Sequence, residues 1–508
     1  MAILDISDKL PQSTLFYVAV GVATILVLLQ RVTTVNKHGS EPPFIPKRVP
    51  FFGHLFGVLF EQTNYYARMS KQYGHKLYSL AMPGGRVYVV NSPDYVSNIQ
   101  KNPRDLSFWF IEASLTKNLG GSSDKANIIL LENARGDKGS NSLVVDGMKV
   151  THKAMTGEAL DILSLAAINR AKRAIDNSIN SSVEIELWDW SQHVFSLAVS
   201  SSVYGPENPY ENERLTRSLT QFADHTPTFL TGLPPWLFMP KAYKAREDIV
   251  ARFQHYFNSK FDQQASELVK VRAKVLREYG IPESDIARFE AVNGFRILLN
   301  LLPTAFWTIW HVFADSDLLS AVRAEALAAG IAAHKDCFPA TIDELKRLDN
   351  LHLLISVMKE AMRHHGAGVA ACMVMNDHLL AGEYLLKYNS YFFIPNAAIH
   401  FDCSSWGPNI DKVVPNRFTK DSGEKIHPAA FRGFGGGVNL CPGKAYSVRL
   451  ITAVVVAVVL RYEPMCEDKD DNGEWRDPGH DEKSMAITLA RPLREVNVKF
   501  AERVMMAL

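Results

Sequence analysis

A glycine-rich loop with one cysteine, followed directly by a long apolar helical pattern, limits the fold of this chain more than any other stretch. Residues 442–460 read PGKAYSVRLITAVVVAVVL, which predicts a largely buried helix. Just before it, three consecutive glycines at 435–437 weaken any strand or helix and let the backbone approach a bulky group. Cys441 precedes the first helical turn, where unpaired N–H groups and the helix dipole favour a thiolate. Three roles are open to this thiol: catalytic nucleophile, metal ligand or inert buried cysteine.

Length and composition narrow the class of protein. The chain has 508 residues, too many for one simple core, so we expect a large single enzyme domain or several domains. The formal net charge of +1, without a block of Lys or Arg, gives no basis for nucleic-acid binding. The five cysteines are scattered without a C-x-x-C pair, which argues against a disulfide framework or structural zinc and favours a reducing compartment.

An uncharged stretch near the N-terminus predicts a membrane anchor. Residues 13–30 carry no charge, and their number is near the lower limit for crossing the hydrocarbon core. The alternatives are a cleaved signal peptide or a buried helix. A signal peptide has a basic start and a small-residue cleavage site, whereas this chain begins with Asp5, Asp8 and Lys9 and shows no clear cleavage site. We therefore expect an uncleaved span, and no second one further along the chain.

Basic residues after this stretch set the predicted orientation. They are Arg31, Lys37, Lys47 and Arg48. Positive charge beside a span marks its cytosolic side, so the rest of the chain is expected in the cytosol. The proline-rich residues 41–57 predict a stiff connector between the anchor and a globular part.

The remaining chain is expected to be mainly α with a minor β part. Residues 77–93 predict a hairpin that turns at 83–85, and short strands are expected around 383–394 and 485–500. Helical patterns dominate the middle of the chain, including one long amphipathic helix over 246–280.

An apolar segment at 229–240, FLTGLPPWLFMP, allows two interpretations. It is either a buried loop or a second membrane contact, the latter because four apolar side chains form a compact tip. These side chains are Trp236, Leu237, Phe238 and Met239.

The cysteine loop has neighbours that give it a more specific meaning. Phe434, Gly437, Cys441 and Gly443 follow the spacing F-x-x-G-x-x-x-C-x-G. This loop resembles the haem-binding loop of the cytochrome P-450 superfamily. The resemblance implies a haem b cofactor whose iron takes the Cys441 thiolate as axial ligand, a donor that favours O–O cleavage. The glycines would bring backbone amides near the sulfur, and Phe434 would shield the ring face.

Further residues resemble the structural part of this family. Glu360 and Arg363 match its E-x-x-R helix motif, and Arg417 lies in PNRF, which resembles the P-x-R-F segment. In the family these residues form a buried ion network behind the haem, which implies a structural role in haem incorporation. His400 also falls where the family usually has a histidine.

Residues 291–319 resemble the long distal helix of the family, and in detail that of the bile-acid sterol hydroxylases, prostacyclin synthase and fungal relatives. This branch carries Asn, then Pro, then Phe-Trp, here Asn300, Pro303, Phe306 and Trp307. We expect Pro303 to break the helix locally and free a carbonyl near the oxygen site. Asn300 takes the place of the usual proton-delivering alcohol, and we assign it a catalytic role in holding a water.

Several positions depart from the family pattern. The acid–alcohol pair is missing, Asn439 replaces the usual Arg or His, Met373 stands where an arginine is common, and 146–157 contains no W-x-x-x-R. Haem propionates must therefore contact other groups. The candidates are Lys149, His152, Lys153 and Arg432.

The resemblance also implies a lipophilic substrate pocket on the distal side of the haem. Its expected residues are Phe108 to Ile111, Leu301, Thr304, Val369, Ala370, Ala486 and Ile487. Their apolar character suits a ligand held by few polar groups.

These features together lead us to expect a P-450 fold with an N-terminal transmembrane helix. Residues 1–40 would be anchor and linker, and 41–508 the catalytic domain. The implied activity is that of a haem-thiolate monooxygenase at the endoplasmic reticulum membrane, oxidising a steroid-like compound or secondary metabolite. Electrons would come from NADPH through a separate cytochrome P-450 reductase, because no flavin or dinucleotide motif is evident.

Three alternatives compete with this expectation. A haem-thiolate isomerase or dehydratase would need no NADPH. A hydrolase or transferase would use Cys441 as nucleophile with a histidine such as His427 as base. The third is a non-enzymatic haem-binding or membrane scaffold protein.

Overall fold

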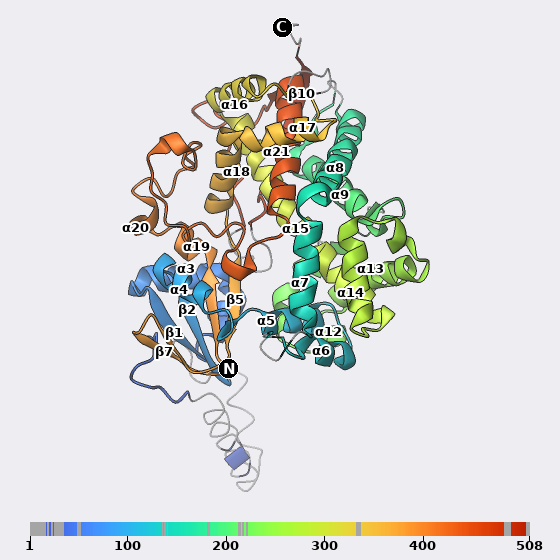
Figure 1. Cartoon of the computed structure of the whole chain (residues 1–508). Helices are drawn as coiled ribbons and strands as arrows, with labels where there is room; N and C mark the ends of the chain where they lie inside the picture. The colour runs from blue at the N-terminus through green and yellow to red at the C-terminus, as the bar shows by residue number, and fades with distance from the viewer. Residues whose placement is uncertain are drawn as a thin grey trace, which may run out of the picture.

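The computed structural model describes residues 17, 20, 21, 24, 35–47, 52–134, 136, 139, 141–179, 183–211, 215, 218, 219, 222–331, 337–481 and 489–503 (Figure 1). Of the predicted membrane span at 13–30, only four residues belong to this part of the chain. The anchor prediction therefore lies outside the described residues.

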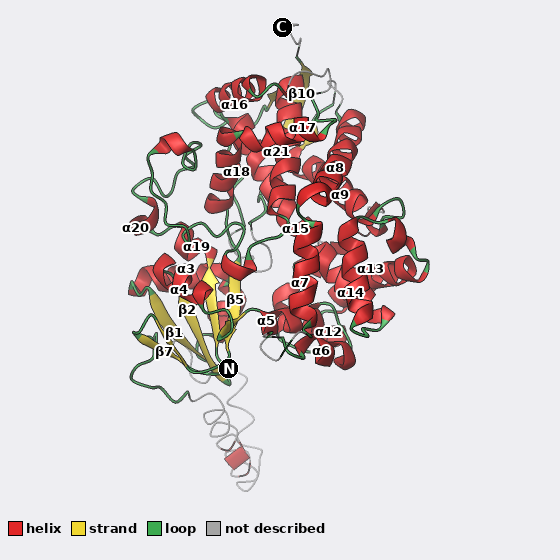
Figure 2. Ribbon diagram, in the orientation of Figure 1, coloured by secondary structure: helices red, strands yellow, loops and turns green. Residues whose placement is uncertain are grey.

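Helices make up most of the described chain, and a small β region packs at one corner of the molecule (Figures 1 and 2). The prediction of a mainly α fold with a minor β part is confirmed. The α-helices are α2 (Leu55–Glu61), α3 (Thr63–Tyr73), α4 (Pro93–Lys101), α5 (Trp109–Ser114), α6 (Asp124–Leu131), α7 (Leu143–Ala154), α8 (Gly157–Ser178), α9 (Leu187–Tyr204), α11 (Thr226–Leu230), α12 (Pro235–Phe238), α13 (Pro240–Asn258), α14 (Glu267–Glu278), α15 (Glu283–Ala314), α16 (Ser316–Ala328), α17 (Ile342–Arg347), α18 (His352–His364), α19 (Asn396–His400), α20 (Cys403–Trp406) and α21 (Lys444–Arg461).

The strands form three sheets among the described residues. They are β1 (Leu77–Met82), β2 (Gly85–Val90), β3 (Leu106–Ser107), β4 (Ile185–Glu186), β5 (Val369–Val374), β6 (His378–Leu380), β7 (Tyr384–Leu386), β8 (Tyr391–Pro395), β9 (Tyr462–Met465) and β10 (Asn497–Glu502). The main sheet has the order β1-β2-β8-β5-β3, and only its β2–β8 pairing is parallel. β4, β10 and β9 form a second, antiparallel sheet, and β6 pairs with β7.

The predicted hairpin is present as β1 and β2. Their antiparallel register runs from Leu77 opposite Val90 to Met82 opposite Gly85. Gly84, in the turn, has a φ of +78°, a conformation that glycine adopts without the steric cost of a Cβ. The strands expected around 383–394 are β7 and β8.

The proline-rich segment is partly packed onto this sheet. The carboxylate of Glu41 is buried and pairs with the guanidinium of Arg86 in β2. The N–H of Ile45 donates to the carbonyl of Ser79 in β1 at 3.0 Å. The prediction of a stiff connector over 41–57 is therefore wrong for its first residues, because a buried ion pair and a backbone hydrogen bond hold them to the domain.

The long helix predicted over 246–280 is two helices, α13 and α14. Between them, at 259–266, Lys260 adopts a φ of +58° and a 3₁₀ turn follows. The hydroxyl of Ser266 then donates to the carbonyl of Val203 at the end of α9, at 2.8 Å. This tertiary contact turns the chain back, whereas the amphipathic periodicity alone carries no mark of the break.

α15 is a central helix of the fold, in contact with α9, α13, α18 and α21. By length and composition it is the one described helix that could cross a bilayer, but 72% of its most apolar window is buried inside the protein. The composition of α15 thus resembles that of a membrane span, so the expectation that no later stretch does so is wrong. Because most of this window is buried, α15 is a core helix, which explains why it is apolar over most of its circumference.

Pro303 lies inside α15 without interrupting it. The hydroxyls of Thr304 and Thr308 donate to the carbonyls of Asn300 and Thr304, at 2.9 and 2.7 Å. Proline removes the N–H that would bond to the carbonyl four residues earlier, but the buried neighbours on both sides keep the helix whole. The predicted local break is therefore wrong.

The apolar segment at 229–240 contains the end of α11, a non-helical stretch at 231–234 and the short helix α12. Trp236, Leu237 and Phe238 are 64%, 68% and 56% exposed, so the interpretation as a buried loop is wrong for these side chains. Met239 does not belong to the exposed tip, because it is buried in the core.

Candidate active site

The cysteine loop has a backbone shape that requires glycine. Gly435 and Gly437 have φ values of +72° and +60°, which L side chains rarely adopt. A Cβ on Gly435 would also lie 2.5 Å from the carbonyl oxygen of Asn439. The loop is closed by the N–H of Cys441, which donates to the carbonyl of Phe434 at 2.9 Å. These constraints hold the thiol at the start of α21.

Cys441 is an exposed residue, yet protein surrounds its sulfur closely enough that desolvation raises the pKa of the thiol. The backbone N–H groups of Gly443 and Lys444 act in the opposite direction, as the helix start predicts. A raised thiol pKa makes a free thiolate nucleophile less favourable, whereas a metal ion at the sulfur would stabilise the thiolate directly. This arrangement fits the predicted role of metal ligand better than that of a free nucleophile.

Phe434 lies at the side of this loop and is nearly buried. Its ring centre is 6.5 Å from that of Phe431, and the Lys444 ammonium lies over it at 5.9 Å. An aromatic side chain held from two sides can cover the face of a flat cofactor beside the thiol.

Arg432 is a buried cation that an anion beside it would stabilise. Its Nε and Nη1 atoms have no hydrogen-bond partner among the residues that the structure describes, and burial lowers its pKa. A Cβ on Gly436 would lie 2.9 Å from Arg432 Nη1 and 2.5 Å from Gln100 Nε2 of α4. Since burying an unpaired charge is costly, a carboxylate at this position would stabilise the site. A haem propionate meets this need.

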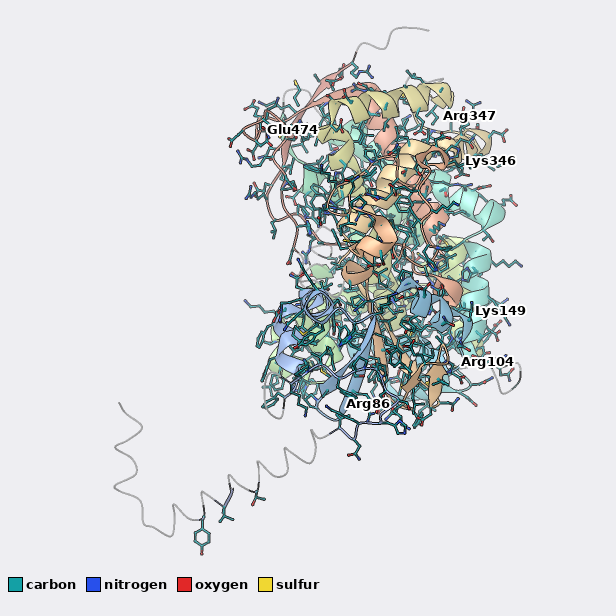
Figure 3. The ribbon with its side chains drawn as sticks, turned by 90° about the vertical axis from the view of Figure 1, so that its left-hand side faces the viewer. Arg86, Arg104, Lys149, Lys346, Arg347 and Glu474 are labelled. Carbon is teal, nitrogen blue, oxygen red and sulfur yellow. The ribbon has the colours of Figure 1, made fainter. Side chains whose placement is uncertain are left out.

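The other propionate candidates lie on or beside α7 and lack this environment. Lys149 is 71% exposed and pairs with Asp146 at 3.2 Å, and Figure 3 shows it at the molecular surface. Lys153 is exposed as well, and His152 is half-buried. Among the four candidates, the structure therefore favours Arg432.

Glu360, Arg363 and Arg417 form an ion network with fully buried side chains. Glu360 Oε1 accepts from Arg363 Nη2 at 2.8 Å and from Arg417 Nε at 2.9 Å. Other guanidinium N–H groups donate to backbone carbonyls, for example Arg363 to Ile410 at 2.8 Å, and Arg417 Nη1 also donates to Glu424 Oε2 at 3.0 Å. Such a network is stable only while its partners are all present.

His400 links this network to the cysteine loop. Its Nε2 accepts the backbone N–H of Arg432 at 2.9 Å, and its Nδ1 lies 3.1 Å from the carbonyl of Arg363. Only the neutral tautomer with the proton on Nδ1 satisfies both contacts. Burial lowers the pKa of His400 to about 3, which keeps it neutral.

Asn300 lies on α15, where its side-chain Nδ2 donates to the carbonyl of Arg296 at 3.0 Å. Thr304 continues the same face, since its hydroxyl donates to the carbonyl of Asn300. The catalytic role of Asn300 stays a prediction, and its amide is oriented along this helix face.

The predicted substrate residues come from three elements. Phe108 directly precedes α5, Ala370 lies in β5, and both pack against the same hydrophobic cluster. α5 contacts β5, while Leu301 and Thr304 are buried in α15. Val369 is half-buried in β5, and Ala486 and Ile487 lie outside the described residues.

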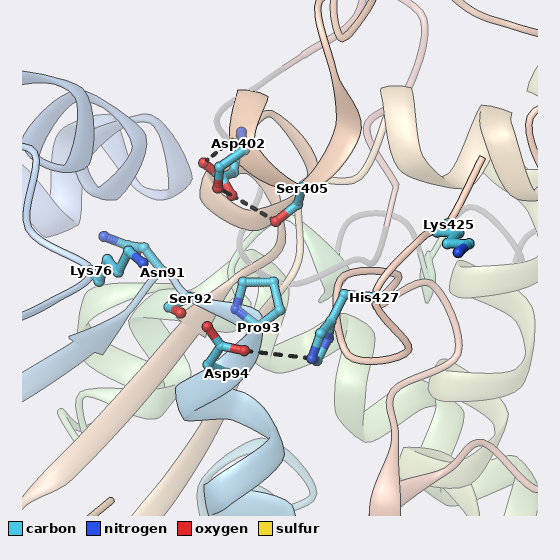
Figure 4. A pocket seen from close by; sticks show the side chains of 10 residues that line it. Lys76, Asn91, Ser92, Pro93, Asp94, Asp402, Ser405, Lys425 and His427 are labelled. Atoms are coloured by element: carbon cyan, nitrogen blue, oxygen red, sulfur yellow. Dashed lines mark hydrogen bonds and ion pairs between the residues drawn. The ribbon is translucent and has the colours of Figure 1, made fainter.

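A surface pocket of about 220 Å³ lies elsewhere, between the start of α4 and α20 (Figure 4). Its lining is polar and carries both charges, so it does not suit a lipophilic ligand. His427 lies here, with its Nε2 3.6 Å from Asp94 and its Nδ1 accepting the N–H of Ala429. The structure gives no support to the nucleophile alternative, because no hydrogen bond between His427 and Cys441 is present among the described residues and His427 contacts Asp94 and Ala429 instead.

Sequence reasoning missed one polar contact at the distal elements. Arg296 of α15 pairs with Glu112 of α5 through two bonds of 2.7 Å. A signal for it existed, because Arg296 is the only Lys, Arg, Asp or Glu between residues 291 and 314. A lone charged side chain in such an apolar stretch is costly to bury without a partner of opposite charge.

Comparison with known proteins gives this site its family. A family model, Cytochrome P450, matches residues 301–478. The Cytochrome P450 monooxygenase nodJ of Hypoxylon pulicicidum is 29% identical over 91% of this chain and 90% of its own length. The chain belongs to the cytochrome P450 superfamily. This P450 is a monooxygenase, an oxidoreductase, which excludes the hydrolase and scaffold alternatives.

Two further similarities concern the fold and the branch. The heme domain of a cytochrome P450DA mutant superposes with a TM-score of 0.68 at 16% identity, over 91% of this chain and 98% of that one, which confirms the fold. The human 7-alpha-hydroxycholest-4-en-3-one 12-alpha-hydroxylase is 22% identical over 85% of this chain and 87% of its own length. The predicted branch is thus represented among the relatives, at low identity.

Proposed function

We propose that this P450 hydroxylates, or otherwise oxidises, a lipophilic small molecule in the biosynthesis of a steroid-like compound or another secondary metabolite. The exposed residue Cys441, in a loop whose backbone requires glycine at 435 and 437, is the observation that carries the proposal. The apolar side chains of Phe108, Leu301 and Ala370 on the distal elements support a lipophilic ligand. The steroid-like class is supported by the relative whose name contains 7-alpha-hydroxycholest-4-en-3-one.

Each residue of the site would have its own role in holding or supporting haem b. When bound through a thiolate, haem iron supplies the oxygen chemistry. Cys441 would hold the iron, Arg432 a propionate and Phe434 the ring face, while Glu360 and its partners keep the loop in place. Asn300 would position a water by hydrogen bonds, since an amide both donates and accepts but does not release a proton as an acid does.

Electrons would reach this P450 from NADPH through NADPH–cytochrome P-450 reductase, at the endoplasmic reticulum membrane. The charge-free residues 13–30 support a single-pass anchor with a cytosolic catalytic domain. The exposed tip of Trp236, Leu237 and Phe238 supports a second contact with the membrane interface.

Deleting 1–30 should release most of the protein from membranes. Serine at the three tip positions should release more, whereas Ile162→Ser, at an exposed apolar site on α8, should not.

Turnover with and without NADPH and reductase tests the proposed reaction. We expect oxidised products from a lipophilic metabolite extract only when both are present. Asn300→Ala should keep NADPH consumption but release hydrogen peroxide in place of much of the product. Asn293→Ala, at a position seven residues before Asn300 on α15 where the amide donates to Glu290, should stay coupled. Full product formation without NADPH and reductase would instead establish the isomerase or dehydratase alternative.

A further inference from the structure

The only charged side chain in the apolar part of α15 is bound by a residue of α5. Arg296 Nη1 and Nη2 donate to Glu112 Oε1 and Oε2, both at 2.7 Å. A planar guanidinium and a carboxylate joined in this way form a rigid, oriented pair. The pair therefore connects two elements at a defined position and has a net charge of zero.

These two elements both carry predicted substrate residues. Phe108 is the residue before α5, and α5 contacts β5, which holds Ala370. Arg296 and Thr304 are joined along one face of α15 through Asn300 by side-chain to backbone hydrogen bonds. The Glu112–Arg296 pair thus spans two of the three walls of the proposed pocket.

The pair is not sealed by protein. The side chain of Arg296 is 33% exposed and that of Glu112 is 21% exposed, whereas the side chains of Glu360 and Arg363 are fully buried. A guanidinium has five N–H donors and a carboxylate has about four lone-pair positions, of which the two bonds use two each. Further donors and acceptors therefore remain on two partly exposed side chains.

We propose that Glu112 and Arg296 together bind a neutral oxygen, a hydroxyl or a ketone, of an otherwise apolar substrate. A hydroxyl suits the pair because it donates to the carboxylate and accepts from the guanidinium at once. A substrate carboxylate suits it less, since Glu112 opposes the attraction of Arg296. This inference rests on the proposed function, and it adds the polar group that orients the substrate.

A second ion pair on the same helix provides a matched control. Arg288, two turns before Arg296, donates to Glu247 at 2.9 and 3.1 Å, with side chains 21% and 30% exposed. This pair joins α15 to α13 instead of α5. Arg288→Met therefore removes a comparable pair from the same helix without touching the proposed pocket.

The test uses probe pairs that differ by one oxygen: cholestane with cholestanol, and hexadecane with hexadecanol. Dissociation constants for the haem-loaded full chain are measured by spectral titration and, independently, by equilibrium binding of the radiolabelled probes. We expect the alcohol of at least one pair to bind roughly tenfold to a hundredfold more tightly than its hydrocarbon, as for hydrogen bonds to charged groups. The double variant Glu112→Met with Arg296→Met should lose this preference and still bind the hydrocarbon. Arg288→Met should keep it.

The ratio within a probe pair separates recognition from a merely structural role. A loosened α5 would weaken the alcohol and the hydrocarbon alike and leave their ratio unchanged. An unchanged ratio in the double variant would overturn the proposal, as would equal affinity, or no binding, for both members of every pair in the wild type. If the double variant does not fold, Arg296→Lys, which keeps the charge but not the fork, should reduce the ratio. The carbon monoxide band and NADPH-dependent turnover are followed alongside. Absence of this band and of NADPH-dependent turnover in the wild type would refute the proposed function. If both are present but the wild type shows no preference for the alcohol, only this inference is refuted.

Discussion

Two charged regions of the molecule are built on different principles. In one, Glu360, Arg363 and Arg417 are fully buried and bond to one another, to backbone carbonyls and, from Arg417, to Glu424. In the other, the Glu112–Arg296 pair joins α5 to α15 and stays partly exposed. In the first region a change of one partner leaves a buried charge, so few residue types fit. In the second, accessible polar atoms can exchange protein or water partners for those of a ligand, so this region can vary with the substrate.

The largest effect should come from the Cys441 thiol. Cys441→Ser should abolish the thiolate-type Soret band of the reduced, carbon monoxide-bound protein, together with turnover, because a neutral hydroxyl cannot replace thiolate donation. Cys403→Ser, at an exposed position in α20, should change neither. A retained thiolate-type band in Cys441→Ser would show that another residue binds the iron.

The buried network should be more sensitive to the loss of one carboxylate than a partly exposed ion pair is. Glu360→Gln leaves Arg363 and Arg417 without their shared carboxylate and should lower the free energy of unfolding by roughly 3–5 kcal/mol, as for a broken buried pair. Glu61→Gln, which removes a partly exposed pair with Arg68, should cost about 0–1 kcal/mol. Urea unfolding of both variants measures the difference. Equal costs would contradict the contrast between a sealed and an accessible ion pair.

Acid should destabilise the protein because several buried histidines are neutral in the folded state. Burial lowers the pKa of His311 and His400 to about 3 and that of His364 to about 4. Between these values and the unfolded value of about 6.5, the unfolded chain binds more protons, so stability falls as pH falls. Each histidine should contribute a slope of about 1.4 kcal/mol per pH unit. Urea midpoints between pH 7 and pH 5 test this, and His364→Gln should reduce the slope while the exposed His193→Gln should not.

The smallest effect should come from Arg432, and it should have opposite signs with and without cofactor. Arg432→Met should weaken haem binding roughly tenfold, because a propionate loses its cation. The haem-free protein should be as stable as the wild type or more stable, since a buried unpaired charge has been removed. Haem transfer to apomyoglobin and thermal unfolding of the haem-free protein measure the two effects. Lys149→Met, at the surface, should alter neither, and unchanged haem transfer in Arg432→Met would exclude the propionate contact.

Features that depend on nearby residues could be predicted from the sequence. The hairpin at 77–93 and the helix after Cys441 follow from local patterns, since turn residues and apolar periodicity act over a few positions. The Glu360–Arg363 pair was predictable in the same way, because residues three apart share a helix face. For Arg432 the sequence offered four candidates, and only burial distinguished it.

Tertiary structure decided what depends on residues far apart. Glu41 is held by Arg86, the helix over 246–280 breaks where Ser266 meets Val203, and Met239 turns into the core. Sequence periodicity reports which face of an element is apolar, but not which element will cover it. Arg296 shows the limit most clearly. Its position in an apolar helix indicates that it needs a partner of opposite charge. Which residue that is, Glu112 at 184 residues' distance in the chain, depends on how α5 and α15 pack together.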